Sequence, residues 1–332
     1  MSHLFLRRGA GDMGESDDTG DLSCKRCKRC DGIFALPRVW LALAYAWVLA
    51  LVVSVHMPAS AAAPGTVYFP TADGKVELVG YLYSPVVPGP HPAVVLLHGR
   101  AGPYSSRVNA QCQTIARGTA SACGATTLSG RHTQWGEYWA AHGYVALLVD
   151  SFGPRGRGHG YGRNTHGAPE RDAVNELTVR PADAVAALDY LSALPRVQPH
   201  RVMLQGWSHG ASTTLNVLHS QVLAAPKNRT SQVKFRAALA FYPGCGPKAV
   251  LARKLQLDVP LTVFLASDDE EVSPLVCREL LARSGGEPTV IWYPGATHDF
   301  DNPDRSRQSV AANRTAHDDA LRRAVAFFDG VP

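Results

Sequence analysis

A serine flanked by two glycines stands in the middle of the chain, in the sequence GWSHG at residues 206–210. The apolar run RVML precedes this motif closely, and a stretch with helical periodicity, 211–223, follows it. A G-x-S-x-G sequence between a strand and a helix makes a sharp turn that exposes the serine hydroxyl. The start of the helix also favours developing negative charge. We therefore expect Ser208 to be a nucleophile rather than an ordinary surface serine.

A serine hydroxyl is a poor nucleophile until a base takes its proton, and the base is expected later in the chain. His298 meets this requirement, because it follows the last predicted strand in the segment YPGATHDF. His317 precedes the C-terminal helix in a polar segment and should face solvent, whereas His98 comes before Ser208. His209 adjoins the serine, but its side chain should point away from it. The sequence therefore predicts His298 as the base.

An acidic side chain should orient the imidazole, and the sequence offers four in a row, DDEE at 268–271, after a predicted strand. Counting three residues on from the end of that strand, Ala266, selects Asp269. Counting four back from Pro274 selects Glu270 instead. We prefer the strand end as the reference, because it fixes where the side chain can reach. Asp269 is therefore the predicted acid, with Asp268 and the two glutamates as alternatives.

Two backbone N–H groups are needed to stabilise the oxyanion that forms when a carbonyl is attacked. His209 follows the nucleophile and should supply one N–H. Arg100, in the loop HGRAGP after the strand predicted at 93–97, should supply the other. The Arg100 side chain could also pair with a substrate carboxylate, and Trp207 could wall the pocket. Both are predicted to bind substrate, with core packing as the alternative for Trp207.

Short apolar runs alternate with stretches of helical periodicity over most of the chain. The expected strands are 76–83, 93–97, 145–149, 201–204, 237–241, 261–266 and 289–293. The expected helices are 181–194, 211–223, 274–283 and 318–328. This alternation predicts one α/β domain, with a mostly parallel sheet covered by helices on both faces. The candidate residues then lie at the edge formed by the carboxyl ends of the strands.

Residues 1–61 are expected to form a polar N-terminal extension and a signal peptide, which precede a catalytic domain at 62–332. The uncharged run at 39–55 follows Arg38 and is soon followed by small residues that include Ala59-Ser60-Ala61. This pattern is typical of a cleaved secretory signal and predicts a periplasmic or extracellular protein without stable membrane association. The alternative is an uncleaved anchor through 39–55, since this length is near the lower limit for a spanning helix.

The cysteines fall into two groups. A C-x-x-C-x-x-C run at 24–30 resembles half of a metal site, but it has no partner nearby and precedes the predicted cleavage point, so no metal is expected. The other four follow that point, where an oxidising compartment favours disulfides. Cys112–Cys123 is the favoured pair because the two lie close in sequence, and Cys245–Cys277 then remains. Four buried free thiols are the alternative.

Composition narrows the function classes. The chain has 332 residues, of which 45% are hydrophobic and 18% charged, as in ordinary globular proteins rather than disordered chains or coiled coils. Its formal net charge of +5 is too small and too dispersed to predict nucleic-acid binding.

The chain resembles the dienelactone hydrolase family of α/β-hydrolases from about Gly65 to Phe328. The resemblance is carried by LLHGRAGPYS, LSGRHTQWGEYWAAHGYVALLVDSFGPRG, VRPADAVAALDYL, GWSHG and YPGATHDF. It implies an α/β-hydrolase fold and hydrolysis of a small ester or lactone through an acyl-enzyme, without a cofactor. The enzymes that named the family have a cysteine where Ser208 stands and a glutamate where Gly99 stands. This chain should therefore act as a serine esterase or lactonase.

Two other functions remain open at this point. The same set of catalytic residues serves peptidases and cutinase-like enzymes that degrade polyesters. A catalytically silent α/β-hydrolase used as a binding scaffold belongs to a different class, and such scaffolds normally lack the serine or the histidine that are both present here.

Overall fold

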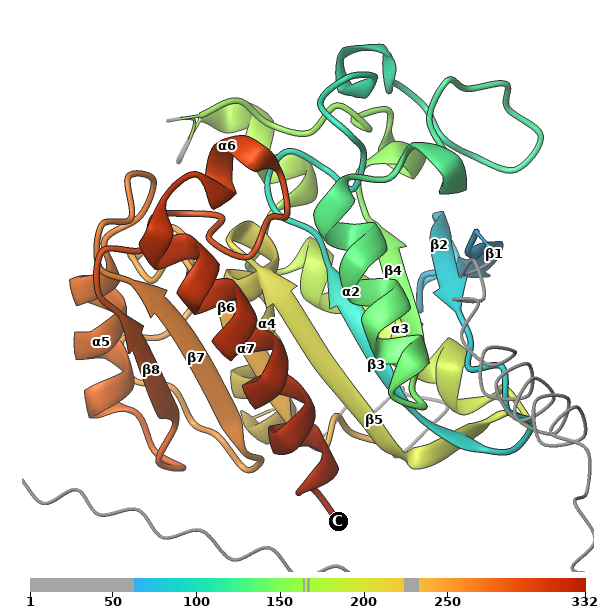
Figure 1. Cartoon of the computed structure of the whole chain (residues 1–332). Coiled ribbons are helices and arrows are strands. Elements are labelled where there is room, and N and C mark those ends of the chain that lie inside the picture. Colours follow the sequence, from blue (N-terminus) through green and yellow to red (C-terminus); the bar gives the residue numbers. More distant parts are fainter. Residues whose placement is uncertain (1–62, 164, 166–167, 224–232) are drawn as a thin grey trace, which may run out of the picture. The chain divides into compact units, whose positions relative to one another are not determined.

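Eight strands form one sheet in the computed structural model, which describes residues 63–163, 165, 168–223 and 233–332 (Figure 1). Their order across the sheet is β1-β2-β4-β3-β5-β6-β7-β8. β1, β2 and β4 pair antiparallel, and the remaining neighbours from β4 to β8 pair parallel. The strands are β1 (Gly65–Pro70), β2 (Glu77–Tyr83), β3 (His91–Leu97), β4 (Val145–Asp150), β5 (Val197–Trp207), β6 (Ala238–Phe241), β7 (Leu261–Ala266) and β8 (Thr289–Tyr293).

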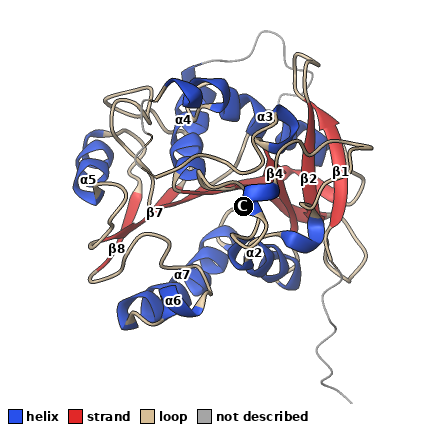
Figure 2. Ribbon diagram, turned by 90° about the horizontal axis from the view of Figure 1, so that it is seen from above, coloured by secondary structure: helices blue, strands red, loops and turns tan. Residues whose placement is uncertain are grey.

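Helices cover both faces of the sheet, as the view from above shows (Figure 2). α3, α4 and α5 lie on one side, and α2, α6 and α7 lie on the other. The helices are α2 (Gly130–Ala141), α3 (Val179–Ser192), α4 (His209–Leu223), α5 (Pro274–Arg283), α6 (Arg305–Gln308) and α7 (Ala311–Asp329). This architecture confirms the predicted α/β fold with a mostly parallel sheet.

The core consists of two apolar layers, because successive side chains of a strand point to opposite faces. In β3, Val95 and Leu97 pack with the layer that contains Leu188 of α3 and Leu215 of α4. Leu96 of the same strand packs with the other layer, to which α2 and α7 contribute tryptophan and alanine side chains. The central strands are buried on both faces, which explains why they read as continuous apolar runs.

Three of these elements were not predicted: β1, α2 and the short helix α6. β1 is an edge strand whose side chains are mostly exposed or half-buried, so its sequence carries little hydrophobic pattern. α2 has a glycine in its interior, Gly136, which contacts the ring of Tyr83 so closely that a Cβ would overlap it. Its N-terminus is capped by Ser129, which accepts from the backbone N–H of His132. Glycine is unfavourable inside a helix, so the close packing against Tyr83, and not helix propensity, explains the glycine at position 136.

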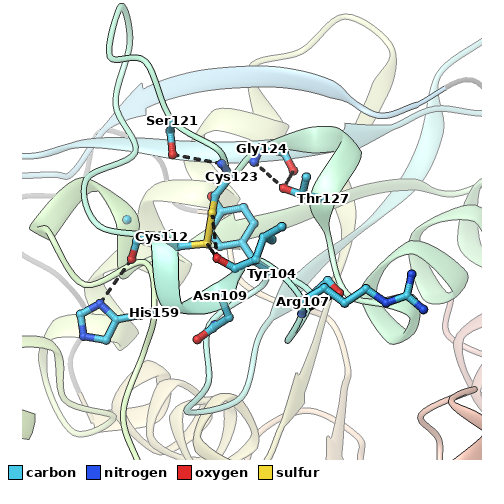
Figure 3. Close-up of a disulfide and its surroundings, with 12 residues drawn as sticks. Tyr104, Arg107, Asn109, Cys112, Ser121, Cys123, Gly124, Thr127 and His159 are labelled. Carbon is cyan, nitrogen blue, oxygen red and sulfur yellow. Dashed lines mark hydrogen bonds between the residues drawn. A yellow bond between two sulfur atoms is a disulfide. The ribbon is translucent and has the colours of Figure 1, made fainter.

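The loops that follow the carboxyl ends of the parallel strands gather at the upper end of the sheet in Figure 1. Two disulfides fix them, Cys112–Cys123 and Cys245–Cys277, which is the predicted pairing. The first closes the long loop between β3 and α2, where the carbonyl oxygen of Cys112 also contacts the His159 ring (Figure 3). The second joins the loop after β6 to α5. Disulfides of this kind are typical of exported proteins.

The predicted extension, signal peptide and C-x-x-C-x-x-C run lie outside the described residues. Within the described part of the chain, no helix has both the length and the apolar character needed to cross a bilayer. One compact unit extends from Ala61 to Pro332, and it carries every candidate site residue.

Candidate active site

Ser208 occupies the turn between β5 and α4 with a backbone φ of 51°, in the left-handed region that non-glycine residues rarely adopt. The two flanking glycines allow this turn. A Cβ on Gly206 would overlap the carbonyl oxygen of Gly210, and a Cβ on Gly210 would overlap that of Leu97 in β3. The strand and the helix therefore approach too closely for side chains at these positions. This packing places Ser208 where β5 ends.

The structure brings Ser208, His298 and Asp269 together from three separate loops. His298 Nε2 lies 3.1 Å from Ser208 Oγ, and His298 Nδ1 lies 2.8 Å from Asp269 Oδ2. The other oxygen of Asp269 accepts from the backbone N–H groups of Glu271 and Val272, each at 2.9 Å. The carboxylate is therefore fixed by its own loop and aligned with the imidazole. In this arrangement His298 can receive a proton from Ser208 at Nε2 while Asp269 holds Nδ1.

The alternative acids contact other groups. Asp268 is exposed and accepts from the Ser267 hydroxyl at 2.6 Å. Glu270 accepts from the backbone N–H of His298 at 2.9 Å and forms an ion pair with Arg307 at 2.7 Å. Among the four consecutive carboxylates, Asp269 is the one that contacts His298 Nδ1. Glu270 contacts the main chain of the same histidine.

The pKa of the His298 imidazole is raised above its ordinary value. Burial alone would lower this pKa, but the hydrogen bond to Asp269 and the charges of Asp299, Asp269 and Glu271 outweigh that effect. Glu271 Oε2 lies only 3.8 Å from His298 Nε2. The ring of His298 also packs against the ring of Tyr242, with 4.6 Å between centroids. The surroundings therefore favour the protonated imidazole that forms when a serine proton is transferred.

Two backbone N–H groups next to Ser208 are available to a substrate oxyanion. His209 begins α4, and the N–H groups of a first helical turn have no acceptor within the helix. Arg100 follows Gly99 in the loop after β3, and in the described part of the chain its N–H donates to no other group. Gly99 packs against the turn that carries Ser208, because a Cβ added to Gly99 would lie 3.7 Å from the Ser208 Cβ.

Arg180, which sequence reasoning missed, links the two loops that carry these N–H groups. Its guanidinium is fully buried, with Nη2 donating to the His98 carbonyl oxygen at 2.8 Å and Nη1 lying 2.6 Å from His209 Nδ1. His209 Nε2 in turn lies 2.7 Å from Glu176 Oε2. Burial first, and then the charge of Arg180, lower the His209 pKa to about 4 even though Glu176 opposes this. His209 is therefore neutral near pH 7 and accepts from Arg180 at Nδ1.

Arg100 and Trp207, both predicted to bind substrate, make contacts within the protein. The Arg100 guanidinium donates two hydrogen bonds of 2.9 Å to Glu271 and one of 3.0 Å to the Tyr161 carbonyl oxygen. It lines the cavity beside Ser208, but its charge is already paired there. Trp207 is fully buried and donates from Nε1 to Asp301 at 2.7 Å. This side chain packs in the core, which was the alternative interpretation.

A cavity of about 190 Å³ is lined by Ser208 and His298 and by several charged side chains. Arg131 is one of these, and it donates to Asp299 at 2.7 Å and to the Tyr242 hydroxyl at 2.8 Å. Arg131 lies in the first turn of α2, and its charge lowers the pKa of Asp299 although burial alone would raise it. The cavity therefore has room for only a small part of a substrate.

Metal ligands do not gather anywhere in the described residues, where no group of three or more histidine, cysteine or acidic side chains could hold an ion. The site itself brings together a serine with an aligned base, two backbone N–H groups and a small cavity.

Comparisons with known proteins bear on the fold and the family of the chain. No curated protein sequence matches the chain significantly. A dienelactone hydrolase-like promiscuous phosphotriesterase from metagenomic libraries is 18% identical, with a TM-score of 0.56 over 81% of this chain and 99% of its own. A dienelactone hydrolase candidate from Klebsiella pneumoniae is 16% identical, with a TM-score of 0.57 over 80% and 98%. A propionate-bound thermophilic esterase from Thermogutta terrifontis is 17% identical, with a TM-score of 0.52 over 82% and 97%.

These structural similarities establish the fold, an α/β-hydrolase fold. The model of the dienelactone hydrolase family matches residues 123–331, which include the GWSHG turn, the acidic loop and His298. Because this match covers more than half of the chain, the protein belongs to the dienelactone hydrolase family.

Proposed function

We propose that this protein is an exported serine hydrolase that cleaves carboxylic esters or lactones through an acyl-enzyme. The observation that carries the proposal is the line of contacts from Ser208 Oγ through His298 to Asp269, at 3.1 and 2.8 Å, beside a cavity. This is the geometry that a nucleophile, a general base and an orienting acid require. Membership of a hydrolase family supports the same reaction class.

In the first half of the reaction, Ser208 Oγ attacks the ester carbonyl carbon while its proton moves to His298 Nε2. Asp269 holds the imidazole at Nδ1 and stabilises the charge that forms on it. The negative charge on the carbonyl oxygen is placed against the N–H groups of Arg100 and His209. His298 then gives the proton to the departing alkoxide oxygen, and the acyl group stays on Ser208.

The second half repeats these steps with water as the nucleophile. His298 takes a proton from the water, whose oxygen attacks the acyl carbon. Collapse of this second tetrahedral intermediate breaks the bond to Ser208 Oγ, which regains the proton from His298. The carboxylic acid leaves, and no metal or organic cofactor takes part in any step.

Two features support the proposed export. The sequence before the catalytic domain has the pattern of a secretory signal, and the domain itself holds two disulfides. Disulfides persist in the periplasm and outside the cell, whereas cytosolic thiols are kept reduced. A fractionation experiment on the producing cells, with a blot against the catalytic domain, tests this part directly.

The central test is labelling by a fluorophosphonate, which reacts only with an activated serine. We expect stoichiometric labelling at Ser208, located by peptide mass, and turnover of p-nitrophenyl acetate at neutral pH. Ser208→Ala should abolish both. Ser106→Ala is the matched control, because Ser106 is an exposed serine that lines the same cavity. Equal turnover in wild type and Ser208→Ala, or a clear preference for peptide amides over esters, would contradict the proposal.

A further inference from the structure

A second cavity, of about 450 Å³, lies beside the first and differs from it in chemistry. Its walls come from the loop after β6, residues 244–249, and from the acidic loop and α5, where Val272 and Val276 line it. The surface that these walls expose is mainly apolar, although Lys248, Glu271 and Ser273 also line the cavity. The volume falls in the range of about 300–1,000 Å³ that is usual for small-molecule sites. The cavity next to Ser208, in contrast, is small and lined by charged groups.

Glu271 forms part of both cavities and stands at the boundary between them. Its Oε2 lies 3.8 Å from His298 Nε2, the atom that faces Ser208. Arg100 holds the same carboxylate with two hydrogen bonds of 2.9 Å, and Arg163 adds an ion pair at 2.9 Å. The Glu271 side chain therefore lies between the apolar cavity and the His298 imidazole.

The floor of the apolar cavity rests on the helix that follows the nucleophile. Ser212, one turn beyond Ser208 in α4, donates to the carbonyl oxygen of Gly244 at 2.8 Å. A Cβ on Gly244 would lie 3.4 Å from Ser212 Oγ and 3.7 Å from Val272. The hydrogen bond between Ser212 and Gly244 therefore ties the loop after β6 to the start of α4, which fixes this wall of the cavity relative to Ser208.

The Cys245–Cys277 disulfide joins the two opposing walls. Cys245 lines the cavity, and Cys277 follows the lining residue Val276 in α5. The covalent link prevents the loop after β6 and α5 from separating. Because the walls are already held in place, binding an apolar group in this cavity does not require a loop to become ordered. This lowers the entropic cost of binding.

We propose that this cavity binds the alcohol portion of an ester substrate, as an alkyl or aryl group. The proposal deepens the esterase function and rests on it. His298 Nε2 must give its proton to the departing alcohol oxygen, so the alcohol lies on the side of the imidazole that Glu271 flanks. The smaller polar cavity is then left for a short acyl group. The substrate class is therefore esters that join a short acid to an apolar alcohol.

The test compares ethyl acetate with butyl acetate, with acid release followed by pH-stat. Each methylene that becomes buried is worth about a fourfold change in kcat/KM. Butyl acetate has two more methylenes than ethyl acetate, so we expect the wild type to prefer it by about fifteenfold. Val276→Trp should remove most of this preference by filling the cavity. Gly246→Leu is a second filling variant, because a Cβ on Gly246 meets no atom within 4 Å and the site accepts a side chain.

Leu275→Trp is the matched control, since Leu275 neighbours Val276 in α5, is 50% exposed and does not line the cavity. It should keep the wild-type preference, with thermal melts to show that all three variants fold. An unchanged preference for butyl acetate in both filling variants would overturn the proposal. It would also be overturned if rates depended on the length of the acyl chain in a series of methyl esters and not on the length of the alcohol. Failure of the esterase function itself looks different, because no ester, ethyl acetate included, would then be hydrolysed in a Ser208-dependent way.

Discussion

Glu270 Oε2 accepts a hydrogen bond of 2.9 Å from the backbone N–H of His298. The histidine is therefore held by two neighbouring carboxylates in different ways, because Asp269 contacts its imidazole and Glu270 its main chain. Arg307 pairs with Glu270 at 2.7 Å and keeps that side chain in place. The count back from Pro274 selects Glu270, which contacts the main chain of His298. The count on from Ala266 selects Asp269, which contacts the imidazole ring.

Asp269→Asn is expected to lower kcat by about 10³ to 10⁴ while the protein stays folded. An amide can hold His298 in the tautomer that has its proton on Nε2, where it cannot accept from Ser208. Steady-state kinetics on p-nitrophenyl acetate measure the loss. Asp268→Asn is the control, since this exposed carboxylate contacts Ser267 and should keep activity close to wild type. A strong loss in Asp268→Asn with an active Asp269→Asn would reverse the assignment.

Glu270→Gln is expected to cost about tenfold in kcat or less, because the amide oxygen can still accept from the backbone N–H of His298. The ion pair to Arg307 is lost, but that pair is partly exposed and contributes little. Glu270→Ala should cost more than Glu270→Gln, since it leaves the His298 N–H without its acceptor. If the two variants lose equal activity, the hydrogen bond to the main chain does not position the histidine.

Local sequence was enough to select Ser208 and His298, which the structure places 3.1 Å apart, because the GWSHG turn and the loop after the last strand each carry their own signal. Asp269 followed from the end of β7, which is rigid. Arg180 could not be found in this way, since it touches His98, which lies far away in the sequence. Glu271 was named only as an alternative acid, and its pairing with the distant Arg100 carried no local signal. The covering helices were predicted where their periodicity is regular.

The pH profile should depend on Glu271. Activity requires neutral His298, so kcat/KM rises with pH through the His298 pKa of the free enzyme. Glu271 helps to raise this pKa. Glu271→Gln removes that charge and leaves Arg100 without its carboxylate, and both changes disfavour the imidazolium. The rising limb should therefore move to lower pH in the variant.

The control for this experiment is Glu279→Gln, an exposed glutamate on α5 outside both cavities. Its kcat/KM profile should superimpose on that of the wild type. A rising limb that moves to higher pH in Glu271→Gln, or that does not move, would show that another group governs the acid side of the profile.

Loss of the Cys245–Cys277 disulfide should lower the free energy of unfolding by about 3–4 kcal/mol, the value for a loop of this length in the chain-entropy model. Replacement of both cysteines by serine, with urea unfolding in the presence and absence of reductant, measures it. The wild type should lose stability on reduction. The double variant should respond less, through Cys112–Cys123 alone. Equal responses of the two proteins would mean that this disulfide does not stabilise the domain.

Arg180 should act on the oxyanion hole through position rather than by contact with substrate. Its guanidinium holds the His98 carbonyl oxygen and the His209 ring, and so fixes the loops that carry the N–H groups of Arg100 and His209. Arg180→Lys keeps the charge but cannot reach both partners, because a single ammonium replaces a planar fork. We expect kcat to fall by about 10² to 10³, the cost of losing one oxyanion donor, with little change in KM.

A thionoester comparison separates this role from a general loss of structure. Sulfur accepts hydrogen bonds weakly, so an intact oxyanion hole favours the oxygen ester over its thiono analogue, and a displaced hole loses that discrimination. Arg155→Lys is the matched control, since Arg155 pairs with Asp183 at 2.8 Å in the same region but does not contact the His98 or His209 loops. It should keep the wild-type ratio of ester to thionoester rates. If Arg180→Lys keeps that ratio too, while its Tm falls, Arg180 stabilises the fold and does not position the N–H groups.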